Sequence, residues 1–350
     1  AQRAAFCDQL MILCASRPVV MWNAVADIKK LREALFPLLG PQVFAQLEDG
    51  MLLHALLESE ESHTLEDVGA TYGVLPPYKH LRTVAGAEDV YNAADLVQTC
   101  LVWLRLVEMV AKDPQTEFIY RTMSLPFIWL IIEGEEAGIR VDPATPVSLY
   151  RAYDLKREQG TALARAYSGW PINLNSPDHI KHALYNLEGL PIQREKTVRW
   201  AGEGKATTGK EAIAALRRLQ GTEWDADVPP TLDLAWANID EGGHPLLEAR
   251  YLFLGAQQAI SHYIMPCLTL DEGAADGKNA LRPVARIWPQ CRQHVQASGR
   301  HSYVEPALSQ FRDDLLTLIT PDPGTVWIGW DWKQIEVRLL AYLATDAVYI

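Results

Sequence analysis

The chain has 350 residues, of which 49% are apolar and 22% are charged, and its formal net charge at pH 7 is −12. This length and apolar content predict two or three domains with buried cores and exclude a disordered or fibrous protein. The longest strongly apolar run, Leu125–Ile132, is much shorter than the roughly 18 to 20 residues that a transmembrane helix needs, so we expect no membrane partner.

The five cysteines form no Cys-x-x-Cys pair, and their odd number does not indicate a disulfide framework. A reducing, intracellular setting fits this pattern, and we expect a cytoplasmic protein. The cysteines are Cys7, Cys14, Cys100, Cys267 and Cys291.

Charge is distributed unevenly along the chain. Residues 41–70 contain seven acids and no Lys or Arg, whereas residues 191–220 contain seven bases against three acids. Residues 281–312 contain five arginines against Glu305 alone. Each run by itself is typical of a solvated face, so charge alone identifies no nucleic-acid partner.

The first third of the chain is predicted to be mixed α/β. A short apolar run at 18–21 precedes helical spacing at 26–39 and two helices with a turn between them within 51–74. Helical periodicity then covers 88–111. A second long helix is predicted over 116–138, where Gly138 is well placed as its C-cap.

The middle of the chain is predicted to be helical. Asn175 or Ser176, followed by Pro177, forms a typical helix start, and Gly189 ends that helix. A basic loop from Arg194 then leads into a short helix, and the spacing within 244–268 predicts a long one.

The periodicity changes near the C-terminal end. Apolar residues at every second position of 326–330 predict a strand, and apolar residues at helical spacing predict a helix over 335–343. Asp331 lies between them. An acid at such a junction is most often a helix N-cap, but it is also a suitable ligand for Mg²⁺, which takes hard oxygen atoms.

The segment DWKQIEVR, residues 331–338, resembles motif A of the family A (DNA polymerase I-like) DNA polymerases, whose usual form is DYSQIELR. The resemblance implies that Asp331 is a catalytic residue and a ligand of two Mg²⁺ ions. It also implies that Glu336 is the steric gate that favours deoxynucleotides; the alternative is a surface acid paired with Lys333 or Arg338. Trp332 keeps an aromatic side chain in place of Tyr, whereas Lys333 adds a charge beside the metal site.

Other segments resemble the same family in the same order. Residues 296–300, QASGR, are similar to its Thr-Gly-Arg element, and residues 172–192 and 206–219 are similar to its thumb. The resemblance implies that four side chains hold the primer-template backbone: Arg292, Arg300, Ser302 and Gln310.

The basic loop 194–210 would then lie at the tip of the thumb. There, Lys205 and Lys210 would follow the DNA duplex through phosphate contacts. Binding of this kind weakens steeply with salt.

A weaker resemblance lies in the N-terminal third. Residues 22–31 resemble the H-N-A-x-F-D segment of proofreading 3′-5′ exonuclease domains, which implicates Asn23 and Asp27, and Tyr91 and Asp95 match their Y-x-x-x-D. The resemblance implies acids that bind two metal ions and a tyrosine that orients water. Without Asn23 and Asp27, Tyr91 and Asp95 are an ordinary pair on one helix face. The family's D-x-E has no counterpart in residues 1–26, so we do not expect proofreading.

The sequence therefore predicts an α/β plus α fold with three domains: an RNase H-like exonuclease-type domain (1–115), a helical linker and thumb (116–280), and the beginning of a polymerase palm (281–350). The predicted function is template-directed DNA synthesis, with primer-template DNA, deoxynucleoside triphosphates and Mg²⁺ as partners. Because the chain begins with Ala1 and ends 19 residues after Asp331, we expect a fragment that is inactive alone. The alternatives are a catalytically inactive DNA-binding relative and a 3′-5′ exonuclease.

Overall fold

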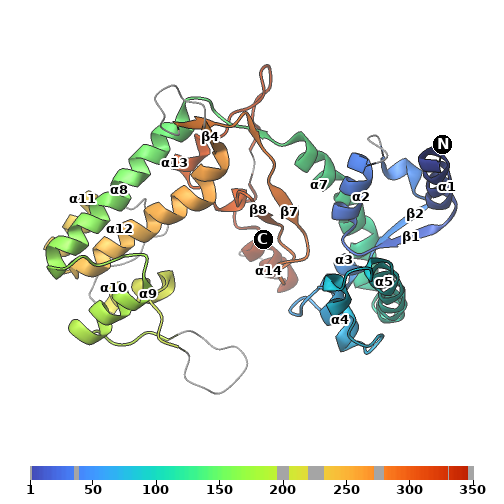
Figure 1. Cartoon of the computed structure of the whole chain (residues 1–350), viewed down its shortest axis with the longest axis horizontal. Helices are drawn as coiled ribbons and strands as arrows, with labels where there is room; N and C mark the ends of the chain where they lie inside the picture. Colours follow the sequence, from blue (N-terminus) through green and yellow to red (C-terminus); the bar gives the residue numbers. More distant parts are fainter. Residues whose placement is uncertain are drawn as a thin grey trace.

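The computed structural model describes residues 2–34, 39–194, 205–219, 232–271, 280–329 and 331–345 (Figure 1). Along the chain these residues form an N-terminal α/β part, a long helical pair with smaller helices beside it, and a C-terminal part built on short antiparallel strands. Within these ranges no helix has the length and the apolar composition that crossing a bilayer requires.

The N-terminal part has two short strands and several helices around one core. Ile28, Leu53, Val102 and Leu106 are fully buried in this core, each on the apolar face of its helix. The elements are α1 (Gln2–Ser16), β1 (Pro18–Met21), α2 (Ala24–Ala34), β2 (Gln46–Asp49), α3 (Gly50–Leu57), α4 (Leu65–Thr71) and α5 (Glu88–Val110).

Strands β1 and β2 pair in parallel, with Val20 opposite Glu48. The expected helix over 88–111 is confirmed as α5. The mixed α/β prediction for this part is also confirmed, but two parallel strands do not by themselves establish an RNase H-like sheet, which stays a prediction.

A bent helical segment leads out of the N-terminal part. It consists of α6 (Pro114–Ile119), a π-helical turn (Tyr120–Ser124) and α7 (Leu125–Ala137), so the predicted helix over 116–138 is confirmed with a π turn inside it. Gly138 ends α7 with φ 64°, as its predicted capping role requires. Ile128 and Ile132 of α7 are buried in the N-terminal core, beyond the predicted boundary at residue 115.

The helical part is centred on two long antiparallel helices that lie side by side in Figure 1. Smaller helices pack at their far end around a second core. The elements are α8 (Thr145–Ser168), α9 (Pro177–Lys181), α10 (Lys210–Leu219), α11 (Leu232–Asp240) and α12 (Pro245–Ala259).

Helices α8 and α12 approach closely because Gly160 of α8 carries no side chain. A Cβ atom built at Gly160 would lie 2.8 Å from the backbone oxygen of Ala249 in α12. The predicted helix start is also confirmed: Ser176 caps α9 by accepting a hydrogen bond from the His179 amide at 3.3 Å.

The C-terminal part contains short antiparallel pairs. Strand β3 (Ile139–Arg140) pairs with β6 (Arg286–Ile287), β4 (Leu268–Asp271) with β5 (Ala280–Pro283), and β7 (Gln290–Arg292) with β8 (Ser302–Val304). Helices α13 (Asp313–Leu316) and α14 (Ile335–Leu343) follow. A third core joins this part to the near ends of α8 and α12.

The predicted strand over 326–330 is wrong for the residues that the structure describes there. Residues 325–329 are irregular, and Val326, Trp327 and Ile328 are exposed. A strand needs a neighbour to complete its backbone hydrogen bonds, and none of the described strands pairs with this segment. Trp330 lies outside the described residues, whereas the predicted helix over 335–343 is confirmed as α14.

A buried ion pair holds the helical part together. Arg217 of α10 donates to both oxygens of Glu248 in α12, at 2.7 and 2.9 Å, and both side chains are fully buried. Asn238 of α11 donates to the same carboxylate at 3.1 Å, and the Arg217 guanidinium stacks on Tyr251.

We therefore expect Glu248→Ala to destabilise the helical part by about 3 to 5 kcal/mol, because the substitution leaves a buried cation without its acid. Denaturant unfolding followed by circular dichroism measures this loss. Glu108→Ala is the control: its pair with Arg105 is exposed on both sides, and its removal should cost less than about 0.5 kcal/mol. Equal losses for the two variants would contradict this account.

Candidate nucleic-acid interface

The β7–β8 hairpin carries three of the predicted DNA-binding residues. Arg292 and Ser302 are directly opposite each other on the two strands, and Arg300 lies in the loop between them. Arg292 and Arg300 are exposed, so their guanidinium groups are accessible from solvent. The hairpin thus brings together residues that are eight and ten positions apart in the sequence.

The loop of this hairpin lies against motif A. Arg300 donates to the carboxylate of Glu336, at the beginning of α14, and both side chains are largely exposed. An exposed pair of this kind adds little stability, but it shows that the two segments are neighbours. The sequence predicted Lys333 or Arg338 as the alternative partner of Glu336, but the partner observed is Arg300.

Asp331 is exposed and precedes α14 by four residues. It is not the N-cap of this helix, because the N-cap is Gln334, which has a left-handed backbone with φ 52°. No hydrogen bond or ion pair joins its carboxylate to another residue that the structure describes. The Asp331 carboxylate is therefore accessible to solvent, and no contact with another described residue fixes its position.

The surroundings of Asp331 do not complete a metal site. Nowhere in the described ranges do three His, Cys, Asp or Glu side chains gather in a way that could hold a metal ion. A lone exposed carboxylate supplies one of the several oxygen ligands that Mg²⁺ takes. The described residues alone therefore do not fit the two ions that motif A implies.

The remaining predicted DNA contacts are spread over two parts of the molecule. Gln310 is exposed at the end of a 3₁₀ turn (Leu308–Gln310) in the C-terminal part. Lys205 is exposed in the helical part, beside a β-bridge between Arg194 and Ala206. Lys210 begins α10, but its side chain lies outside the described residues.

In the N-terminal part, Tyr91 and Asp95 share one face of α5, as predicted. Lys79 donates to Asp95 at 2.7 Å and to Tyr91 at 3.2 Å, and Tyr78 donates to Asp95 at 2.5 Å. Burial by itself would raise the pKa of Asp95, but the hydrogen bonds and the charge of Lys79 lower it below its usual value. The cation beside Asp95 in this structure is therefore the Lys79 ammonium group.

Asn23 and Asp27 belong to a different group. Asn23, with φ 76°, and Ala24 donate their amides to the buried carboxylate of Asp49, at 3.3 and 2.7 Å. Burial, followed by the charge of Asp49, raises the pKa of Asp27 to about 6. Asn23 bonds to Asp49 and Asp27 feels the charge of Asp49, whereas Tyr91 and Asp95 contact Lys79, so the four predicted exonuclease residues form two groups.

Asp49 is a central residue that the sequence prediction missed. It caps α3 by accepting from the Leu52 amide at 3.0 Å while it also holds the beginning of α2. Burial raises its pKa, and its backbone hydrogen bonds oppose that shift. An acid directly before the apolar run of residues 51–57 is a typical N-cap, which could have identified it.

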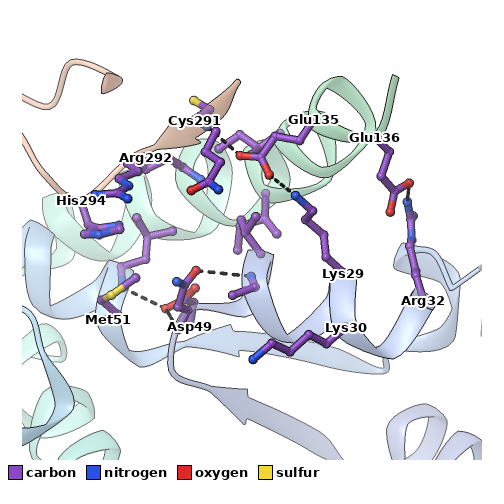
Figure 2. Close-up of a pocket in the computed structure, with 18 of the residues that line it drawn as sticks. Lys29, Lys30, Arg32, Asp49, Met51, Glu135, Glu136, Cys291, Arg292 and His294 are labelled. Carbon is purple, nitrogen blue, oxygen red and sulfur yellow. Dashed lines mark hydrogen bonds and ion pairs between the residues drawn. The ribbon is translucent and has the colours of Figure 1, made fainter. Parts of the chain in front are cut away.

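A cavity of about 720 Å³ lies between α2, α3, α7 and β7 (Figure 2). On one wall, Glu135 of α7 accepts from Lys29 of α2 at 2.6 Å and from the backbone amide of Cys291 in β7 at 2.7 Å. Beside it, Arg32 pairs with Glu136 at 2.5 Å. Figure 2 shows Glu135 between the two elements that it joins.

Histidines mark a second contact between the hairpin loop and the N-terminal part. The Nδ1 atoms of His54 and His63 are 2.8 Å apart, and the His63 ring packs edge-on against His294, with ring centroids 6.4 Å apart. Burial, followed by the nearby His63, lowers the pKa of His54 to about 4. The hairpin loop is thus held against the N-terminal part by neutral imidazoles at pH 7.

No family model matches the sequence. Among curated proteins, the chain is 24% identical over 354 residues to a DNA polymerase I from Synechocystis, covering 95% of the chain and 31% of that protein. It is also 24% identical over 349 residues to a thermostable DNA polymerase I from Thermus filiformis, covering 95% of the chain and 35% of that protein. The chain thus spans about one third of the length of these relatives.

A solved structure shares the fold. The chain superposes on a structure described as the POL domain of Pol1 from M. smegmatis in complex with DNA primer-template and dNTP, with a TM-score of 0.61 and 21% identity. The match covers 97% of this chain and 52% of that one. The molecule is therefore a helix-rich α/β protein with the fold of a polymerase domain.

These relatives confirm the resemblance predicted from the sequence, which is to the family A, DNA polymerase I-like enzymes. The similarity to these relatives extends over nearly the whole chain, as expected from segments that resemble the family in the same order.

We expect Glu135→Ala to destabilise the fold by about 1 to 3 kcal/mol, because it leaves the buried Cys291 amide without an acceptor. Amide hydrogen exchange should increase across β7. The matched control is Glu136→Ala, the neighbouring acid, whose carboxylate is 40% exposed and whose removal should leave exchange at β7 unchanged. Unchanged exchange at β7 in Glu135→Ala would contradict the role given to this residue.

The raised pKa of Asp27 predicts a pH-dependent effect of Asp27→Asn. The folded protein favours the protonated form, so ionisation between about pH 4 and 6 destabilises the fold. Asn cannot ionise, so the variant should be more stable than the wild type at pH 7.5, by up to about 2 to 3 kcal/mol, and equal to it below pH 4. Urea unfolding at several pH values measures this difference; Asp89→Asn, at an exposed position of α5, is the control. A stability gain that does not depend on pH would refute the explanation.

Proposed function

We propose that this chain is the part of a family A DNA polymerase that holds primer-template DNA and contributes motif A to the polymerase site. The proposal rests above all on one juxtaposition, the contact of Arg300 in the Ser-Gly-Arg loop with Glu336 of motif A. The two segments that the resemblance assigns to DNA holding and to catalysis are thereby neighbours.

The DNA in this proposal lies between the helical thumb and the C-terminal part. Exposed arginines of the hairpin bind phosphate oxygens through their fork-shaped donor sets, and Lys205 extends the basic surface along the thumb. The M. smegmatis structure, whose description names primer-template DNA and a dNTP, supports these two partners for the whole protein.

In the whole protein, Asp331 would be one ligand of Mg²⁺, and the metal would lower the pKa of the primer 3′ hydroxyl and stabilise charge on the triphosphate. Glu336, held by Arg300, is the group that discriminates against a ribose 2′ hydroxyl. The exposed apolar side chains of α14, among them Leu339, Leu340 and Leu343, are a surface that further parts of the polymerase cover.

A catalytically inactive DNA-binding relative is the second candidate. Two observations favour it: Lys333 stands beside Asp331, and the described residues offer no further metal ligands there. The exonuclease alternative is less well supported, because Lys79 neutralises Asp95 and Asp27 lies in a separate group.

DNA binding tests the proposal. A labelled primer-template should bind this chain with an affinity that falls steeply as salt increases, and Arg300→Ala or Arg292→Ala should each reduce the slope of log K against log salt by about 1. Arg105→Ala removes an exposed arginine from the N-terminal part and is the matched control. Salt-independent binding, or an equal effect of all three variants, would reject the proposed interface.

Primer extension tests whether this chain is an active polymerase by itself. We expect no nucleotide incorporation by these 350 residues, because Asp331 has no accompanying metal ligands among the residues described. Incorporation by this chain, abolished by Asp331→Asn, would show that the polymerase site is complete without further segments.

A further inference from the structure

Gln310, one of the predicted DNA contacts, is hydrogen-bonded to a residue of the thumb. Its Oε1 atom accepts a hydrogen bond from the hydroxyl of Tyr263 at 3.0 Å. Tyr263 lies in the π-helical turn that follows α12 (Ile260–Ile264) and is 5% exposed, whereas Gln310 is exposed. One end of the carboxamide is thus bound to a buried group, and the other end is free to reach solvent.

The position of the tyrosine is fixed by packing. Its ring meets Phe311 edge-on, with centroids 5.5 Å apart, and belongs to the core that joins the thumb to the C-terminal part. The hydroxyl cannot move without displacing this core, so it is a rigid reference point for the exposed turn at residues 308–310.

The Tyr263 hydroxyl donates to the carboxamide oxygen of Gln310, and because this hydroxyl is buried its proton needs an acceptor within the protein. If the Gln310 amide were reversed, two donors would face each other and the buried proton would have no acceptor.

We propose that Tyr263 is a positioning residue that fixes the Gln310 carboxamide with its NH₂ group directed outward, as a donor to acceptor atoms of bound DNA. This inference rests on the proposed DNA-holding function. Phosphate oxygens and the acceptor atoms of bases in the minor groove are both suitable partners, because each can accept a hydrogen bond from the NH₂ group.

The test is a double-mutant cycle on primer-template affinity, measured by fluorescence anisotropy at fixed salt. Tyr263→Phe keeps the ring and removes the hydroxyl, and it should weaken binding roughly 2- to 10-fold, as should Gln310→Ala. The double variant should bind no more weakly than Gln310→Ala alone, because Tyr263 acts through Gln310. Tyr72→Phe is the control, since it removes a hydroxyl bonded to Met109 in the N-terminal part, and it should bind like the wild type.

A readout without DNA separates this inference from the proposed function. In the ¹H–¹⁵N spectrum of the free protein, the side-chain NH₂ signals of Gln310 should shift in Tyr263→Phe and stay unchanged in Tyr72→Phe. Unchanged signals, wild-type affinity of Tyr263→Phe, or additive losses in the cycle would overturn the positioning role. If the signals shift but the unmodified chain binds no DNA, the orientation stands and the proposed function fails, together with the role in DNA contact.

Discussion

The carboxylate of Glu135 joins parts of the chain that lie far apart in the sequence. It accepts from Lys29 of α2 and from the Cys291 amide of β7, which lie 106 and 156 residues away in the sequence. Because its side chain is almost fully buried, removing either donor leaves the acid poorly satisfied. Together with the packing of His294 against His63, this side chain sets the position of the hairpin relative to the N-terminal part, and hence of Arg292 and Arg300.

The two acids that the resemblance assigns to an exonuclease site, Asp27 and Asp95, differ in what stabilises them. Lys79 and Asp95 neutralise each other directly, and the pair needs no ion to stabilise it. Asp49 is instead buried and Asp27 is partly buried, and the pKa of each is raised, which reduces the cost of two neighbouring acids. Contacts through Glu135 and His294 join this part of the chain to the β7–β8 hairpin.

Local signals in the sequence predicted the helices well. The Ser176 cap, the Gly138 end of α7 and the shared face of Tyr91 and Asp95 depend on neighbouring residues, so periodicity and capping rules suffice. The strand over 326–330 depends on a partner strand, which alternation alone cannot reveal. The partners of Asp95 and Glu336 also escaped prediction, because Lys79 and Arg300 reach them only through the tertiary fold.

Two of the predicted DNA-binding side chains, Arg300 and Gln310, share one physical arrangement. Arg300 is held by Glu336 and Gln310 by Tyr263, and each side chain has further donors that these contacts do not use. A guanidinium has five N–H groups and a carboxamide has two, so a single internal contact fixes the direction of the side chain and leaves donors for a ligand. Side chains oriented in this way lose less conformational entropy when DNA binds than free surface residues lose. The contacts that tie these residues to the protein therefore favour ligand binding by orienting the side chains, even where the pair itself is exposed and adds little stability to the fold.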